Sequence, residues 1–386
     1  MPVRNRIAEM QVEIAGWRRD IHAHPELRFE EHRTAAFVAE KLRDFGCDEV
    51  VTGLGGTGVV GVINGSAPGG CIGFRADMDA LPILEATGVA HASTIPGRMH
   101  ACGHDGHTAM LLGAAKYLGE TRRFAGRVVV IFQPAEEGGG GAAAMLADGL
   151  LDRFGIEEVY GMHNWPGLDV GRFTMRKGAQ FAAPERFDIL VTGKGGHAAM
   201  PHKGTDTTLA AAHILTALQS IAARNADPVD PVVISVCGFR TETDTYNVIP
   251  GTVTLKGTFR AMNMDVQAML RKRIEALAQA TAAAFGASAA LTFLPGPPVL
   301  VNDAQAVDHA VAAAGRVSRA DTDLAPVMGA DDFAEMLRQR PGAYVLVGNG
   351  ASADLHHPSY EFNDAVIPYG CSWLAEMAES RLPLRA

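Results

Sequence analysis

Short apolar runs alternate with longer helical patterns through much of the chain. Val, Ile and Phe dominate the runs, and alanine-rich stretches with a helical spacing of apolar residues lie between them. Apolar strands separated by helices predict a mostly parallel, doubly wound α/β sheet that is covered on both faces. The runs open the segments 71–83, 127–137, 156–166 and 343–358, and helical patterns cover 107–120 and 141–154.

The middle of the chain has a different order of elements. Its hydrophobic pattern predicts β-α-β-β-α-β, which is the ferredoxin-like α+β unit. Asp265 is the expected N-cap of the second helix, and Gly286 is expected to stop it. The expected strands cover 185–193, 231–239, 251–260 and 287–295, and the expected helices cover 204–225 and 265–286.

Turn-rich sequence borders this middle region on both sides, at 182–185 and 294–298. The simplest topology is a small domain inserted into a larger one. We therefore predict a discontinuous α/β domain formed by 1–182 and 295–386, with an inserted domain at 183–294.

Composition narrows the class of ligand. The chain has 386 residues, with 34 Lys and Arg against 43 Asp and Glu, for a net charge of −9. An acidic protein has no overall attraction for nucleic acid or an anionic membrane, so a small-molecule substrate is expected. The five cysteines form no C-x-x-C pair, and the N-terminus lacks the apolar run of a signal peptide, which predicts a cytoplasmic protein.

One glycine-rich motif suggests a nucleotide. The residues "GLGGTG" at 53–58 match the G-x-G-x-x-G pattern of dinucleotide-binding proteins, which requires a helix after the glycines. The β-branched sequence "VVGVI" follows instead. A glycine-rich hairpin is therefore predicted, and a nicotinamide-dependent oxidoreductase is disfavoured.

Side chains that bind metals follow several of the predicted strands. Ligands of open α/β sheets gather at the carboxyl ends of the strands, so these side chains are expected to meet. Any one of them alone has an ordinary structural explanation, but their coincidence at one sheet edge predicts a metal site. The residues are Asp77, Asp79, Cys102, His104, Glu136, Glu137, His163, and His356 or His357.

Charge suggests two divalent ions. One ion would leave a site with the Cys102 thiolate, a carboxylate and a bridging hydroxide net negative, whereas two ions leave one positive charge to polarise a carbonyl. The adjacent carboxylates of Glu136 and Glu137 do not suit one ion together, so one binds metal and the other moves protons. A nucleophilic Cys102 is an alternative without a local cysteine-protease signature. A non-catalytic metal-binding protein is another, but it has little use for the second glutamate.

A set of motifs carries a family resemblance from about residue 14 onward. "DIHAHPEL", "FRADMDALPI", "MHACGHDGHT", "FQPAEEG", "GMHNWP", "GKGGHAAMPH", "NVIPG" and "LHHPSYEFND" occur in this order. Together they resemble the hippurate-hydrolase and auxin-conjugate-hydrolase branch of the aminoacylase/carboxypeptidase-G metallopeptidases. The resemblance implies a zinc-peptidase-like catalytic domain with two metal ions and an inserted lid or dimerisation domain.

The resemblance also implies roles for single residues. Glu136 matches the general base, and Asp79 matches an aspartate that supports a histidine ligand. Asp77 stands where the wider family has a metal-binding histidine, which leaves the division of work between the two aspartates open. The implied metal ligands are Cys102, His104, Glu137, His163 and His356. His197 matches a histidine that reaches a neighbouring subunit's site, and Asn247 and Arg260 match residues that bind the substrate carboxylate.

The expected activity is hydrolysis of the amide bond of an N-acyl amino acid by a homodimer or higher homo-oligomer. Two ions of Mn, Zn, Co or Ni suit the mixture of N, O and S ligands. A dipeptidase or carboxypeptidase of the same fold and a thiol hydrolase using Cys102 are the alternatives. The remaining histidines of these motifs, His100 and His107 among them, are expected to be structural.

Overall fold

The computed structural model describes residues 3–384. The chain divides into two compact units. The first runs to Gln180 and also contains Val301–Ala325 and the chain from Asp331 onward, and the second contains Phe181–Leu300 and Pro326–Ala330. The second unit therefore extends a few residues beyond 183–294 on each side and recruits a short piece of the returning chain.

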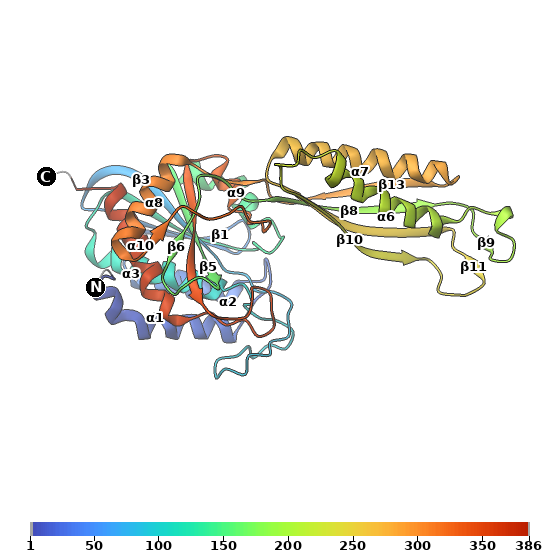
Figure 1. Cartoon of the computed structure of the whole chain (residues 1–386). Coiled ribbons are helices and arrows are strands. Elements are labelled where there is room, and N and C mark those ends of the chain that lie inside the picture. The colour runs from blue at the N-terminus through green and yellow to red at the C-terminus, as the bar shows by residue number, and fades with distance from the viewer. Residues whose placement is uncertain (1–2, 385–386) are drawn as a thin grey trace. The chain divides into compact units, whose positions relative to one another are not determined.

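The first unit, which carries the labels α1, β1 and β3 in Figure 1, is built on a parallel-centred sheet. The sheet has eight strands in the order β1-β2-β4-β3-β5-β16-β6-β15. Its centre, β4-β3-β5-β16, is parallel throughout, whereas β1 and β2 pair antiparallel at one edge. The predicted mostly parallel α/β sheet is confirmed. The strands are β1 (Glu49–Leu54), β2 (Gly58–Asn64), β3 (Ala67–Asp77), β4 (Ala125–Gln133), β5 (Glu158–Pro166), β6 (Phe173–Thr174), β15 (Ala320–Asp321) and β16 (Gly342–Gly350).

The glycine-rich motif at 53–58 forms the hairpin between β1 and β2. Leu54 pairs with Gly58 across the turn, and Gly55 and Gly56 take φ angles of +61° and +99°. Only glycine adopts such angles without strain, so the glycines serve the turn. No helix follows the motif, which confirms the predicted hairpin.

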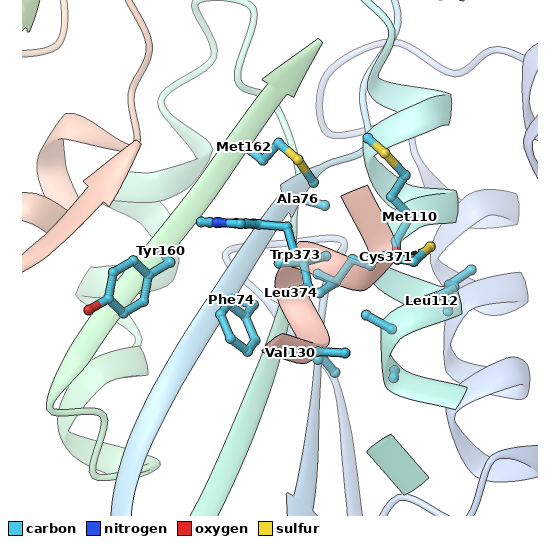
Figure 2. Packing of buried hydrophobic residues seen from close by; sticks show 14 of the residues in the cluster. Phe74, Ala76, Met110, Leu112, Val130, Tyr160, Met162, Cys371, Trp373 and Leu374 are labelled. Atoms are coloured by element: carbon cyan, nitrogen blue, oxygen red, sulfur yellow. Dashed lines mark hydrogen bonds between the residues drawn. The ribbon is translucent and has the colours of Figure 1, made fainter. Parts of the chain in front are cut away.

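Helices bury the sheet through a large apolar core. Trp373 of α10 is fully buried with Phe74 of β3 and Tyr160 of β5, and its Nε1 donates to the carbonyl of Ala310 (Figure 2). Replacing such a buried tryptophan by alanine costs about 3–5 kcal/mol. The helices of this unit are α1 (Asn5–Ala23), α2 (His32–Asp44), α3 (His104–Thr121), α4 (Gly141–Ala147), α5 (Leu150–Arg153), α8 (Ala304–Val317), α9 (Ala334–Leu337), α10 (Ile367–Arg381) and the 3₁₀ turn η2 (Asp364–Val366).

The second unit has a four-stranded antiparallel sheet, β10-β12-β8-β13, and two helices that share one apolar core with it. Its main elements follow the expected order β-α-β-β-α-β. The helix α7 begins differently from the prediction, because Asn263 and not Asp265 is the N-cap and accepts from the Asp265 amide. The elements are β8 (Ala183–Thr192), α6 (Thr207–Arg224), β10 (Val232–Thr241), β12 (Thr252–Ala261), α7 (Met264–Ala284) and β13 (Ser288–Pro295).

Small elements complete the two units. β9 and β11 form a two-stranded ribbon, and β7 pairs with β14. Within residues 3–384, none of the helices combines the length and apolar character needed to span a membrane. The small elements are β7 (Gly178–Phe181), β9 (Gly196–His197), η1 (Pro201–Lys203), β11 (Val248–Ile249) and β14 (Leu300–Asn302).

Candidate metal centre

The carboxyl ends of four parallel strands bring the predicted metal-binding residues together in the first unit. Cys102, His104 and His163 place one possible ligand atom each within 4.8 Å of one another. Cys102 does the same with Glu137 and His356. The two groups share Cys102, so the five residues form one continuous cluster.

The segment from Cys102 to His104 is a tight turn into α3. Gly103 is the N-cap, with a φ of +89°, and His104 is the first residue of the helix. A side chain at position 103 would come within 2.3 Å of Oδ1 of Asn164. The sharp turn directs the thiol and the imidazole toward the same cluster, although they lie two positions apart.

Asp79 forms hydrogen bonds with the segment that carries Glu136 and Glu137 and also with His104. Its carboxylate accepts the backbone N–H groups of Glu136 and Glu137, each at 3.0 Å. Its backbone carbonyl lies 2.8 Å from Nδ1 of His104. A hydrogen bond at Nδ1 leaves Nε2 available to a metal, which is the usual arrangement behind a histidine ligand.

Two buried polar atoms without a hydrogen bond indicate that a metal ion fits this cluster. Nε2 of His104 and Oε1 of Glu137 are buried and have no hydrogen-bond partner among the described residues. They lie 4.0 Å apart, and Oε1 of Glu137 lies 3.2 Å from Nε2 of His356. Buried polar atoms are normally hydrogen-bonded, so two such atoms that lie close together without a hydrogen bond fit a cation between them. The donor set of N, O and S atoms suits a transition metal or zinc.

The electrostatics of the cluster favour the binding of a cation. Burial disfavours a charge on His104, but the carboxylates of Asp77 and Asp79 outweigh burial and raise the pKa of His104 to about 10. Burial and the nearby Glu137 carboxylate raise the pKa of the Cys102 thiol well above its usual value. The acidic surroundings thus favour added positive charge and disfavour a free thiolate.

His163, a member of the cluster, packs against His107, with ring centroids 4.5 Å apart. Nε2 of His163 is 3.4 Å from Sγ of Cys102, and burial followed by the proximity of His107 lowers the pKa of His163 well below its usual value. His107 lies in the first turn of α3, with Nδ1 2.6 Å from Oδ1 of Asp77. Asp77, His104 and His107 could themselves hold an ion, a grouping that the sequence did not suggest.

A second buried acidic group, which the sequence analysis missed, lies beside Glu136. The carboxylates of Glu136, Asp331 and Asp332 offer oxygens within 4.8 Å of one another. Arg75 pairs with both aspartates, at 3.3 and 3.1 Å. Burial, then the carboxylates of Asp331 and Glu137, raise the pKa of Glu136 well above its usual value. Two features of the sequence could have indicated this acidic group. They are the charged Arg75 within an apolar strand and the adjacent aspartates of "GADD" at 329–332.

Of the two neighbouring histidines, His356 is the one that faces the cluster. It takes a positive φ of +65°, and its side chain is about half exposed. His357 instead turns to its own loop, where its Nδ1 accepts the Ser359 amide. The strand-end pattern left open whether His356 or His357 is the ligand. In the structure, His356 belongs to the cluster and His357 does not.

The three residues expected to act on substrate lie in the second unit. His197 on β9 pairs with Val248 of β11, and the Asn247 carbonyl accepts the amide next to His197, so these two residues are neighbours. Arg260 lies near the other end of β12, where its guanidinium donates to the Met328 carbonyl. At about 3.3 Å per residue, the strand separates Arg260 from the His197–Asn247 ribbon by roughly 25 Å.

A parallel α/β sheet with clustered N, O and S ligands at its carboxyl edge, and an unbound glutamate beside them, defines a metal-dependent hydrolase. The comparison with known families agrees. Residues 73–380 match the model of peptidase family M20/M25/M40, and the chain belongs to this family.

Relatives cover almost the whole chain. An N-acetyl-L-cysteine deacetylase of Bacillus subtilis is 39% identical over 97% of this chain and 90% of its own length. A hippurate hydrolase of Campylobacter jejuni is 38% identical, over 96% and 97%. Among solved structures, a Bacillus subtilis protein described as a dinuclear metal binding peptidase from the M20 family superposes with a TM-score of 0.85. It is 32% identical and covers 97% of this chain and 99% of its own.

Proposed function

We propose that this protein hydrolyses the amide bond of an N-acyl amino acid and releases a carboxylic acid and a free amino acid. The observation that carries the proposal is the cluster in which the buried atoms His104 Nε2 and Glu137 Oε1 face one another without a hydrogen bond beside Glu136. Family membership and the hydrolases of N-acyl amino acids among the relatives support it.

The residues that would hold two divalent ions are Cys102, His104, Glu137, His163 and His356. When bound, the ions would supply Lewis acidity to the scissile carbonyl and make a water molecule more acidic. Mn, Zn, Co and Ni all suit this mixture of ligands.

Glu136 is the proposed general base and acid. Asp79 accepts the Glu136 amide and thereby fixes the backbone of Glu136. Within residues 3–384, no side chain or backbone group forms a hydrogen bond with the Glu136 carboxylate that would compete for the proton. It takes a proton from the attacking water and later gives a proton to the departing amine nitrogen. Its raised pKa, caused first by burial and then by Asp331, suits a group that must hold a proton between these two events.

A thiol hydrolase that uses Cys102 is disfavoured by the same surroundings. Nucleophilic cysteines need a lowered pKa and a positive environment. Burial and the carboxylates of Glu137 and Glu136 act in the opposite direction on Cys102. The thiol suits a metal ligand better than a nucleophile.

Substrate recognition is proposed to involve two copies of the chain. His197 and Asn247 lie at one end of the second unit, whereas Arg260 lies near the other end of β12. Groups separated by most of the length of β12 cannot both reach one small substrate within a single copy. We assign Arg260 and Asn247 to the carboxylate of the substrate and His197 to the developing oxyanion, with the two ends contributed by different subunits of a cytoplasmic homodimer or higher oligomer.

A substrate and metal panel tests the proposed function. Protein stripped of metal is reloaded separately with Mn, Zn, Co or Ni and assayed on N-acetylcysteine, hippurate, an indole-acetyl amino acid and a dipeptide. Release of amino acid from at least one N-acyl substrate, dependent on added metal, is expected. Turnover of the dipeptide alone would favour a dipeptidase, and activity that survives complete chelation would favour the thiol mechanism.

A further inference from the structure

A short turn from a distant part of the sequence holds the loop that carries Glu136 and Glu137. We call residues 134–140 the acidic loop and residues 28–31 the clamping turn. Arg28 donates from Nη1 to the Glu137 carbonyl at 2.8 Å, and Glu31 accepts the Ala135 amide on Oε1 at 2.9 Å. The clamping turn therefore contacts the acidic loop on both sides of Glu136.

The backbone of the acidic loop is strained where Glu31 binds it. Ala135 is fully buried and takes a φ of +53°, in the left-handed region that residues with a Cβ rarely occupy. This conformation lets the next two amides, those of Glu136 and Glu137, turn toward the same carboxylate of Asp79. Strained backbone persists only where the surrounding structure determines it, and it concentrates at functional sites.

Glu31 is an unusual group to find at such a position. Its side chain is completely buried, yet its hydrogen-bond donors are the Ala135 amide and the Thr57 hydroxyl, and no Lys, Arg or His of the described chain forms an ion pair with it. A buried carboxylate without a cation costs stability. Its presence therefore indicates a role in placing the acidic loop and not in strengthening the core.

The space around the acidic loop also limits its movement. A Cβ added to Gly139 would lie 2.6 Å from Cβ of Ala135 and 3.3 Å from the ring of Phe29, and one added to Gly141 would meet the Pro134 carbonyl. The loop is thus folded closely on itself and against the clamping turn. The Glu31 carboxylate adds to this packing by accepting the Ala135 amide.

We infer that Glu31 is a positioning residue that holds Ala135 in its left-handed conformation and thereby orients the carboxylates of Glu136 and Glu137. This inference rests on the proposed function for its catalytic consequence, but its structural part is independent of substrate. Glu31 is neither a proposed metal ligand nor the proposed general base, and it acts through the backbone of the acidic loop.

The test compares Glu31→Ala, Ala135→Gly and the double variant with the wild-type protein, all loaded with metal. Hydrogen–deuterium exchange is measured on the peptide that contains residues 134–141. Loss of the Glu31 carboxylate is expected to raise exchange in this peptide about tenfold or more, because the amides held by Asp79 lose their alignment. Glycine adopts a positive φ without strain, so adding Ala135→Gly to Glu31→Ala is expected to restore most of the protection.

Kinetics on an N-acyl substrate provide the second measurement. Glu31→Ala is expected to lower kcat about tenfold or more with KM within about twofold, since misplacement of a catalytic group affects the chemical step. The double variant is expected to recover most of kcat. Ala135→Gly alone is expected to leave kcat close to that of the wild type.

Glu158→Gln is the matched control. Glu158 is a partly buried carboxylate that pairs with Arg381 and Tyr160 at the amino end of β5, away from the carboxyl edge. It is expected to lower the unfolding temperature without changing exchange in the acidic loop or kcat. If Glu31→Ala does not fold, Glu31→Gln, which keeps one acceptor oxygen, takes its place with a smaller expected effect.

Unchanged exchange in the acidic loop of the Glu31 variant would overturn the inference, and so would a double variant without recovery. An equal loss of kcat in Glu158→Gln would show a general effect of stability and would also overturn it. A wild-type protein that hydrolyses no N-acyl amino acid would contradict the proposed function instead, and the exchange measurement would still decide the role of Glu31.

Discussion

Nε2 of His356 lies 3.2 Å from Oε1 of Glu137, although the two residues follow different strands of the sheet. His356 belongs to the loop after β16, and Glu137 to the loop after β4. The strands β4, β3, β5 and β16 are parallel, so their carboxyl ends bring these loops to one edge of the sheet. Cys102 completes the group. The first two predictions concern this group and the glutamate next to it.

Glu137→Gln is expected to lower the metal content of the protein, because an amide oxygen is a weaker ligand than a carboxylate and carries no charge to offset the ion. The measurement is metal content per chain after dialysis against a metal buffer. His357→Ala serves as the control, since His357 turns away from the cluster and its loss is expected to leave both ions bound. Equal metal loss in the two variants would contradict the assignment of Glu137 as a ligand.

Glu136→Gln is expected to lower kcat by about 10²–10⁴-fold, the usual contribution of a general acid–base group. The metal content is expected to remain at about two ions per chain, because the proposed ligands are unchanged. Turnover and metal content are measured on the same preparation. Loss of metal together with activity would make Glu136 a ligand and would contradict its proposed role as a proton carrier.

Mixed oligomers test whether two copies of the chain share a site. His197→Ala and Glu136→Gln are each expected to be nearly inactive. Randomly mixed dimers of the two variants would contain one intact site in every heterodimer, and thus recover about a quarter of wild-type activity. Activity is measured after co-expression of differently tagged chains. Absence of recovery in a purified heterodimer would show that each chain uses its own His197.

His22 predicts a specific pH dependence of stability. It is buried in the first unit, with Nδ1 2.8 Å from Oδ2 of Asp105. Burial opposes its charge, but the Asp105 carboxylate outweighs burial and raises the pKa of His22 to about 9 from 6.5. The protonated form therefore stabilises the fold fully below pH 6.5, and this contribution of at most about 3 kcal/mol is lost as the pH rises through 9.

The measurement is the difference in unfolding temperature between the wild type and His22→Gln, both loaded with metal, from pH 6 to 9.5. The difference is expected to shrink as the pH rises, because the variant lacks the titrating group. His24→Gln provides the control, since His24 is about 40% exposed and is expected to show the pH dependence of the wild type. A constant difference across this range would contradict the stabilising role of charged His22.

The sequence by itself predicted the architecture of the first unit and most of the residues that the structure brings together as candidate metal ligands. Apolar runs separated by helices predicted the parallel sheet, and polar residues at the strand ends predicted where Cys102, His104, Glu137 and His163 would lie. These signals are local in the chain, because strand periodicity and strand ends can be located without knowing the partners. The glycine-rich hairpin was likewise predictable from the β-branched residues that follow it.

Only the tertiary structure decided which other side chains support the cluster. Asp331, Asp332 and Glu31 come from segments without a metal-binding pattern, and the fold alone brings them to Glu136 and its loop. Position 263, not 265, caps α7, because a helix N-cap depends on backbone geometry that several polar residues could satisfy. Contacts between distant segments are fixed by packing and burial, whereas local patterns specify only the elements that pack.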